Sequence, residues 1–131
     1  MSETALVKGV VVAHGGMARG LIDAVSRIAG PQGDALVALS NEDKGPAELE
    51  GDIDALAGDD PTVIFVDLHS GSCGHAAFRS SRARGDRLVL CGVNLPALLD
   101  FVFHRDLPLA DLGPRLVEKA RDAVVAFPRE G

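Results

Sequence analysis

The chain has 131 residues, of which 47% are hydrophobic and only 4% aromatic, and its formal net charge is −6. This length and hydrophobic content predict a single domain spanning residues 1–131, with an aliphatic core. The negative charge argues against nonspecific nucleic-acid binding, which needs clustered Lys and Arg. The sequence shows no signal-peptide pattern, no apolar run of the roughly 20 residues that a membrane helix needs, and no disulfide framework. We therefore expect a cytoplasmic protein with no direct membrane insertion.

Short apolar runs alternate with segments of helical periodicity along the chain. The apolar runs predict strands at residues 6–13, 34–39, 62–67 and 87–91. Helices are predicted over residues 18–29 and 46–57, from Ser72 or Cys73 to about Arg84, over residues 97–103 after the cap Asn94, and from the cap Asp111 onward. Residues 123–127 fit either a helix tail or a short edge strand. The alternation predicts an α/β fold, doubly wound around a mainly parallel central sheet of four to five strands, with helices on both faces.

Apolar residues at helical spacing predict the buried side of each helix. The predicted inner faces are Leu21, Ile22, Val25 and Ile28 in the first helix, Leu49, Ile53 and Leu56 in the second, Ala76, Ala77 and Phe78 in the third, and Val117, Ala120 and Val124 in the last.

Two of the predicted strands end at residues that can carry chemistry. His14 follows the first strand and precedes Gly15 and Gly16, and Asp67 closes the third strand ahead of a glycine-rich loop. In an open α/β sheet such strand ends collect in a crevice where the strand order reverses. We therefore hypothesise that His14 and Asp67 meet there and do the chemistry. The alternatives are a structural role for His14 at the strand end and a helix-capping role for Asp67.

Five short motifs occur in order along the chain: Ala13-His14-Gly15, Phe65-Val66-Asp67, Gly71-Ser72, Ala76-Ala77 and Cys91-Gly92-Val93-Asn94-Leu95-Pro96. Together they resemble the mannose-family enzyme IIA components of the bacterial phosphoenolpyruvate-dependent sugar phosphotransferase system. The resemblance covers about residues 7–127. It implies that His14 is phosphorylated by the phosphohistidine of the carrier HPr and passes the phosphoryl group to a IIB component or a regulatory target. It further implies that Asp67 partners His14, and that the chain forms a homodimer with an edge strand that can be exchanged.

The resemblance also implies a cradle for the phosphoryl group around His14. Backbone amides and a hydroxyl can point at the phosphoryl oxygens, and the N-termini of two helices add favourable dipoles. The residues expected to bind phosphate are Gly15, Gly16, Ser70, Gly71 and Ser72. Because the chain has no P-loop motif, direct use of ATP is not expected. We expect no cofactor and no bound metal.

Other sequence features leave alternatives open. Cys73 and His75 depart from the family pattern, which often has proline and asparagine at these places. Together with His69 and His14 they would suit a small metal- or tetrapyrrole-handling enzyme. Residues 79–87 carry a modest positive cluster, which could face an acidic partner or be a solvated helix end.

Overall fold

The computed structural model describes residues 6–128, which form a four-stranded sheet with strand order β2-β1-β3-β4. All three strand pairs are parallel. The strands are β1 (Lys8–Ala13), β2 (Leu36–Ser40), β3 (Thr62–Val66) and β4 (Arg87–Cys91). The chain passes from β1 to β2 on one side and then crosses to β3 and β4 on the other. The strand order therefore reverses between β1 and β3, which is the place where α/β sheets open a crevice at their carboxyl edge.

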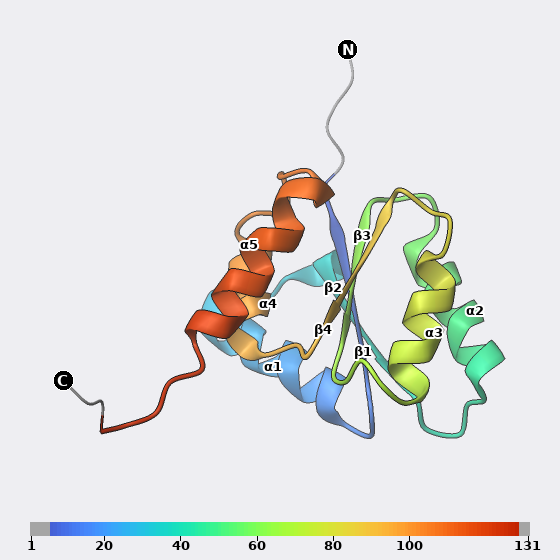
Figure 1. The fold of residues 1–131 in the computed structure, drawn as a ribbon, viewed down its shortest axis with the longest axis horizontal. Helices are drawn as coiled ribbons and strands as arrows, with labels where there is room; N and C mark the ends of the chain where they lie inside the picture. Colours follow the sequence, from blue (N-terminus) through green and yellow to red (C-terminus); the bar gives the residue numbers. More distant parts are fainter. Residues whose placement is uncertain (1–5, 129–131) are drawn as a thin grey trace, which may run out of the picture.

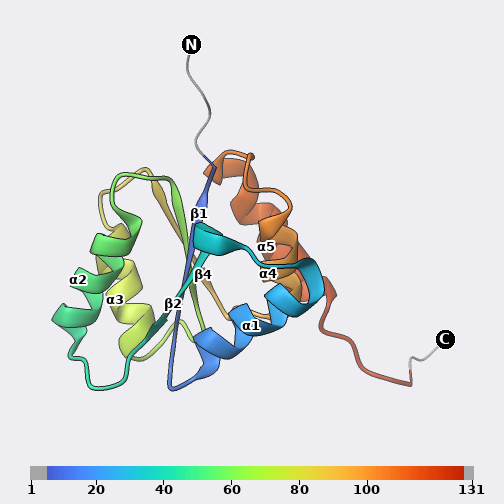
Figure 2. The same ribbon diagram turned by 180° about the vertical axis from the view of Figure 1, so that it is seen from behind.

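Helices cover both faces of this sheet. They are α1 (Met17–Ala29), α2 (Pro46–Ala57), α3 (Ser72–Ser81), α4 (Leu95–Val102) and α5 (Leu109–Asp122), and a short 3₁₀ turn, Gly33–Ala35, precedes β2. Helices α2 and α3 lie on one face, and α1, α4 and α5 lie on the other, in views from the front and from behind (Figure 1, Figure 2). The fold is thus the predicted doubly wound α/β type with four strands.

Alternate residues of β1 belong to the two halves of the core, one on each face of the sheet. Val11 and Ala13 pack with α1, α4 and α5, whereas Val10 and Val12 pack with α2 and α3. Because both faces of a central parallel strand are buried, the strand carries an unbroken apolar run rather than a polar alternation. Five of the six β1 residues are buried, so the strand delivers the next residue, His14, from a rigid frame.

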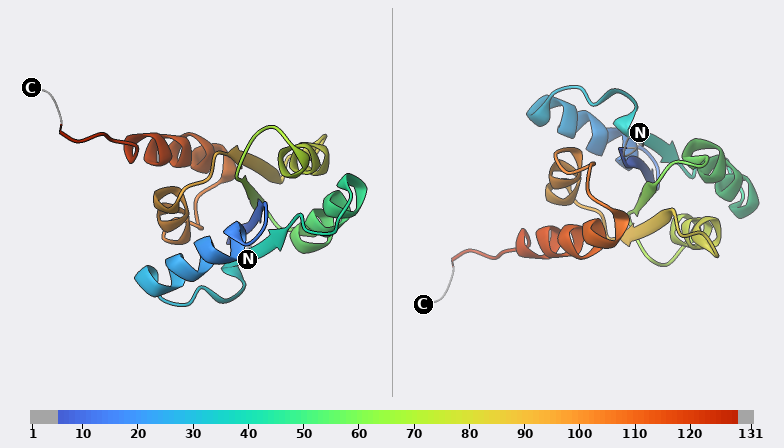
Figure 3. Two further views of the ribbon diagram at one scale, coloured as in Figure 1. Left: turned by 90° about the horizontal axis from the view of Figure 1, so that it is seen from below. Right: turned by 90° about the horizontal axis from the view of Figure 1, so that it is seen from above.

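Two predicted helix faces are wrong in part. Ile28 is 63% exposed, since it lies in the last turn of α1, where the helix extends beyond the strands (Figure 3). Phe78 is also exposed, because the buried side of α3 follows the spacing of Cys73, Ala76, Ala77 and Ser80. Small residues on that side let α3 lie close to the sheet, and the bulky Phe78 ring falls outside it.

The last helix differs most from the prediction. It begins at Leu109, one turn earlier than expected, with Pro108 as its N-cap, so that Asp111 lies in the first turn and is not the cap. Its buried residues are Leu112 and Leu116, and not the predicted apolar set beginning at Val117. The helix ends at Asp122, and residues 123–127 are neither helix tail nor strand. Within residues 6–128 no helix is long and apolar enough to cross a membrane.

Candidate functional site

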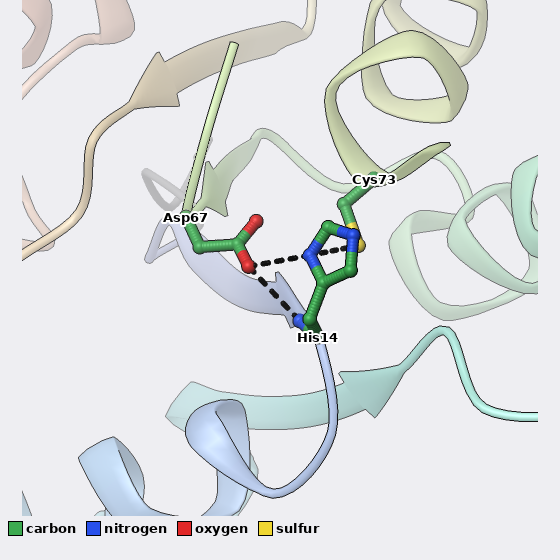
Figure 4. Close-up of side chains that lie close together, drawn as sticks. All are labelled: His14, Asp67 and Cys73. Atoms are coloured by element: carbon green, nitrogen blue, oxygen red, sulfur yellow. Dashed lines mark hydrogen bonds and ion pairs between the residues drawn. The ribbon is translucent and has the colours of Figure 1, made fainter. Parts of the chain in front are cut away.

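His14 and Asp67 meet at the carboxyl edge of the sheet, as predicted. The Asp67 Oδ2 atom accepts a hydrogen bond from the His14 backbone N–H at 3.0 Å and lies 2.7 Å from the His14 ring Nδ1 (Figure 4). The pairing of β1 with β3 explains the contact. Val12 is paired with Val66, so the chain segments that follow the two strands, with His14 and Asp67, emerge next to each other. One carboxylate oxygen thus holds both the backbone and the ring of the histidine.

The two partners differ in their access to solvent. The Asp67 side chain is 8% exposed, whereas that of His14 is 46% exposed. Burial alone raises the pKa of Asp67, but hydrogen bonds from His14 and from the Leu68 N–H, with attraction to the His14 ring, outweigh it. The pKa of Asp67 therefore lies below its ordinary value, and the carboxylate is ionised at neutral pH. Asp67 is not the cap of the following helix, since Gly71 is the N-cap of α3.

The ionised carboxylate fixes the orientation of the imidazole. A carboxylate beside Nδ1 favours the tautomer in which Nδ1 carries the hydrogen and Nε2 keeps its lone pair. The Nε2 side of the ring faces the backbone of Gly71, where a Cβ atom would lie 3.9 Å from Nε2. Gly71 has a φ of 92°, a conformation that residues with a Cβ atom rarely adopt. The glycine thereby brings the α3 loop close to the free nitrogen.

Asn41 links the loops on either side of the site, and sequence reasoning missed it. Its Oδ1 accepts from the Gly15 N–H at 3.3 Å, and its Nδ2 donates to the Ser72 Oγ at 3.4 Å. The available signal was its position directly after β2, the strand that neighbours β1 in the sheet. Polar residues after adjacent parallel strands share one edge, and Asn41 follows the same rule as His14 and Asp67.

The residues expected to bind phosphate surround His14 at the ends of two helices. Gly16 is the N-cap of α1, and Gly71 and Ser72 are the N-cap and first residue of α3. Ser70 is exposed in the loop before α3, and Gly15 turns the chain into α1 with a φ of 57°. The first amides of both helices have no partner within the helix, so the arrangement offers N–H donors on two sides of His14.

Close packing fixes the loop between β3 and α3. A Cβ atom on Gly74 would lie 2.5 Å from the His69 carbonyl oxygen and 2.7 Å from that of Leu68. Real Cβ atoms do not approach backbone oxygens so closely. Gly74 therefore lets the loop fold back over the first turn of α3, which places Gly71 next to the imidazole.

Cys73 is the third residue that reaches His14. Its Sγ atom lies 3.7 Å from the His14 Nδ1, and the side chain comes from the first turn of α3 (Figure 4). Within residues 6–128, one group of three potential metal ligands exists, and it consists of His14, Asp67 and Cys73. His69 and His75 do not join it, so the cluster of His69, Cys73 and His75 expected for a metal-handling enzyme is wrong.

Three of the four arginines in residues 79–87 are paired with carboxylates, whereas Arg82 is exposed. Arg79 pairs with Glu50, and Arg84 pairs with Asp86. Arg87 is buried and donates to Asp54 and to the Ser80 carbonyl, between α2, α3 and β4. Arg79 thus links α3 to α2 and Arg87 links β4 to α2, so much of the positive charge of this segment is balanced within the chain.

Comparison with known proteins gives one consistent result. Residues 8–112 match the family model described as the PTS system fructose IIA component. A phosphotransferase system component EIIA from Streptococcus agalactiae has a similar structure, with 23% identity over 93% of this chain and 98% of that chain and a TM-score of 0.86. A mannose/sorbose-specific IIA subunit from Enterococcus faecalis has 23% identity over 97% and 98% of the two chains, with a TM-score of 0.83. No curated protein sequence matches the chain.

Proposed function

Because the chain belongs to the mannose-type IIA family of the sugar phosphotransferase system, we propose that it is a histidine phosphocarrier. In this proposal His14 accepts a phosphoryl group from phospho-HPr and passes it to a IIB component or to a regulatory target. The observation that carries the proposal is the pair of contacts from one Asp67 oxygen to the His14 backbone and ring, which leaves Nε2 free. The same residues lie at the carboxyl ends of β1 and β3, where the strand order reverses.

The transfer requires a neutral imidazole nitrogen with its lone pair directed at phosphorus. The His14 Nε2 lone pair forms the new bond to phosphorus while the bond from phosphorus to the donor imidazole breaks, and that electron pair stays on the donor nitrogen. The His14 ring then carries a positive charge, which the ionised Asp67 stabilises through the Nδ1–H. In the return step the same bond breaks toward His14, and Asp67 again holds the neutral tautomer.

The negative oxygens of the phosphoryl group need donors that are already in place. We assign this role to the amides at Gly16, Ser70 and Gly71 and to the Ser72 hydroxyl, on both sides of His14. Gly15, whose N–H donates to Asn41, forms the turn that brings Gly16 to the site. Asn41 already bridges Gly15 and Ser72, which keeps the two loops at a fixed spacing. The site provides position and charge, and no further covalent chemistry is required of the protein.

The exposure of His14 suits a phosphoryl donor that is itself a protein. Its side chain is 46% exposed, and it projects from the end of β1 rather than from the floor of a cavity. A cavity of about 130 Å³ lies beside Gly15 and Gly16, but His14 is not among its lining residues. An open histidine can be reached by a second histidine on another protein surface. HPr-dependent transfer places this reaction in the cytoplasm.

A homodimer is part of the proposal. In the described part of the chain, β4 pairs with β3 alone, so its outer backbone edge is available to a further strand. The segment after α5 exposes Val124 and Val125 and runs away from the body of the molecule (Figure 1). An apolar segment next to an open edge strand favours exchange between two subunits.

The direct experiment incubates the purified chain with phosphoenolpyruvate, enzyme I and HPr and measures its intact mass at mildly alkaline pH. Wild type should gain one acid-labile phosphoryl group, and His14→Ala should gain none while keeping its fold. His69→Ala is the matched control, since His69 is exposed nearby and has no role in the proposal. Phosphorylation of His14→Ala, or no phosphorylation of wild type while HPr is phosphorylated, would contradict the proposal.

A further inference from the structure

Cys73 brings sulfur into a site whose proposed chemistry does not use it. The side chain is fully buried among the apolar residues of β1, β3, α2 and α3, yet its Sγ atom faces the His14 ring. Burial, aided by the negative charge of Asp67, raises the pKa of Cys73 to about 11, so the thiol is neutral at physiological pH. A neutral thiol is a weak nucleophile but becomes a strong ligand once a metal ion displaces its proton.

Three different ligand atoms converge at this point. The ring nitrogen of His14, a carboxylate oxygen of Asp67 and the sulfur of Cys73 all lie within 4.8 Å of one another. They come from the ends of β1 and β3 and from the first turn of α3, three elements that the closely packed core holds in place. Imidazole, carboxylate and thiolate are the groups that bind Zn²⁺, whereas Mg²⁺ and Ca²⁺ prefer oxygen alone.

The distances suit a tetrahedral ion. Zinc bonds of ~2.0 Å to nitrogen and ~2.3 Å to sulfur place the two ligand atoms roughly 3.5 Å apart at the tetrahedral angle. The His14 Nδ1 and the Cys73 Sγ are 3.7 Å apart. The Nδ1 and Oδ2 atoms, now at 2.7 Å, must separate to roughly 3.3 Å, because the ion takes the place of the proton between them. The half-exposed His14 ring has room for this movement.

We propose that His14, Asp67 and Cys73 form a binding site for Zn²⁺ that competes with the phosphoryl group for His14. One carboxylate and one thiolate balance the two charges of the ion, so no charge is left unpaired. Because the His14 side chain is 46% exposed, we assign the fourth position to a water molecule. On binding, the thiol proton leaves to solvent, and the ring proton moves from Nδ1 to Nε2.

That proton movement makes the two states exclusive, a step that rests on the proposed function. A neutral imidazole that gives its Nδ1 lone pair to a metal carries its hydrogen on Nε2. Nε2 then has no lone pair for phosphorus. Conversely, phosphorylation at Nε2 leaves the hydrogen on Nδ1, where it faces Asp67 and blocks the ion. Zinc is therefore expected to inhibit phosphoryl acceptance without entering the reaction.

The binding test measures the metal without reference to phosphoryl transfer. Zn²⁺ is titrated into the reduced chain against a colorimetric chelator, and Co²⁺ is added in parallel as a spectroscopic probe. Wild type should bind one ion per chain and show thiolate-to-cobalt charge-transfer absorption. Cys73→Ala should lose this absorption and bind Zn²⁺ more than about tenfold more weakly. Cys91→Ser is the matched control, because Cys91 is the other free cysteine and lies outside the group, and it should bind like wild type.

A wild-type chain without the thiolate absorption, or equal zinc affinity in wild type and Cys73→Ala, would overturn the site. The competition is tested separately by phosphorylating wild type and Cys73→Ala with and without Zn²⁺. A control first establishes zinc concentrations that leave the phosphorylation of HPr by enzyme I unchanged. Zinc should slow wild type only. Equal inhibition of both variants would refute the competition. Failure of wild type to be phosphorylated in the absence of zinc would refute the proposed function instead.

Discussion

At the residue scale the site depends on one carboxylate that performs two tasks. Asp67 accepts from the His14 backbone, which positions the end of β1, and it faces the ring Nδ1, which selects the tautomer. Its low exposure preserves the strength of both contacts, while the histidine stays open to a partner. The charge of Asp67 is therefore expected to matter more than its volume.

Asp67→Asn tests this charge. The amide keeps the shape and can hold the backbone contact, but it cannot stabilise the positive ring that forms during transfer. We expect a folded protein whose phosphorylation by phospho-HPr is roughly 100-fold slower, measured by rapid-quench kinetics. Asp60→Asn serves as the control, since Asp60 is an exposed carboxylate remote from His14. An unchanged rate in Asp67→Asn would remove the carboxylate from the mechanism.

At the scale of elements, the loop from β3 to α3 determines where the site lies. Gly74 allows the loop to fold against the first turn of α3, and Gly71 adopts a left-handed conformation beside the imidazole. A side chain on Gly74 must push two backbone carbonyls away, and so it changes the loop as well as the stability of the fold.

Gly74→Ala should lower the free energy of unfolding by roughly 1–3 kcal/mol and slow phosphorylation, because the overpacked loop moves away from His14. Gly51→Ala is the matched control. Gly51 lies inside α2 with open space around it, so alanine there should raise the free energy of unfolding by roughly 0.5–1 kcal/mol and leave transfer unchanged. Chemical denaturation measures the free energy of unfolding of both variants, and the phosphorylation assay measures transfer. A Gly74→Ala protein as stable as wild type would show that the loop does not need the glycine.

The elements also show what a sequence can predict. Strand ends were predictable, because an apolar run marks a buried strand and the polar residue that stops it, His14 or Asp67, marks where the strand ends. The start of α5 was not, since Asp111 is a good cap residue by type, while Pro108 caps this helix without a side-chain hydrogen bond. Contacts across loops were also hidden. The position of Asn41 after β2 indicated its edge of the sheet, but its contacts, like those of Cys73, depend on how far α3 folds back toward β1 and β2.

At the scale of the whole molecule, the β4 edge of the sheet is open to a further strand. β4 is an edge strand in the described structure, and the apolar segment after α5 begins beside it, since Val124 lines a hollow with Leu90 and Cys91. A groove of about 190 Å³ between β4 and α5, lined in part by Leu88 and Val117, adds apolar surface there. This edge is where the proposed second subunit belongs.

Val125→Asp tests the dimer. A charge in the segment after α5 should make pairing with a partner unfavourable and shift the mass from twice the chain mass of 13.6 kDa to a single chain. Light scattering coupled to size-exclusion chromatography measures this shift. Ile28→Asp is the control, because Ile28 is also apolar and exposed but lies on α1, and this variant should remain dimeric. A wild-type chain that runs as a monomer would refute the dimer itself.

The central claim is that His14 carries the phosphoryl group on Nε2. The most direct measurement is phosphorus NMR of the chain at alkaline pH after phosphorylation by phosphoenolpyruvate, enzyme I and HPr, since the two ring positions give distinct phosphohistidine signals. We predict a single Nε2-phosphohistidine signal that is absent from His14→Ala, because Asp67 occupies the Nδ1 side of the ring. A signal from Nδ1, a signal that persists in His14→Ala, or no signal with active HPr would contradict the account.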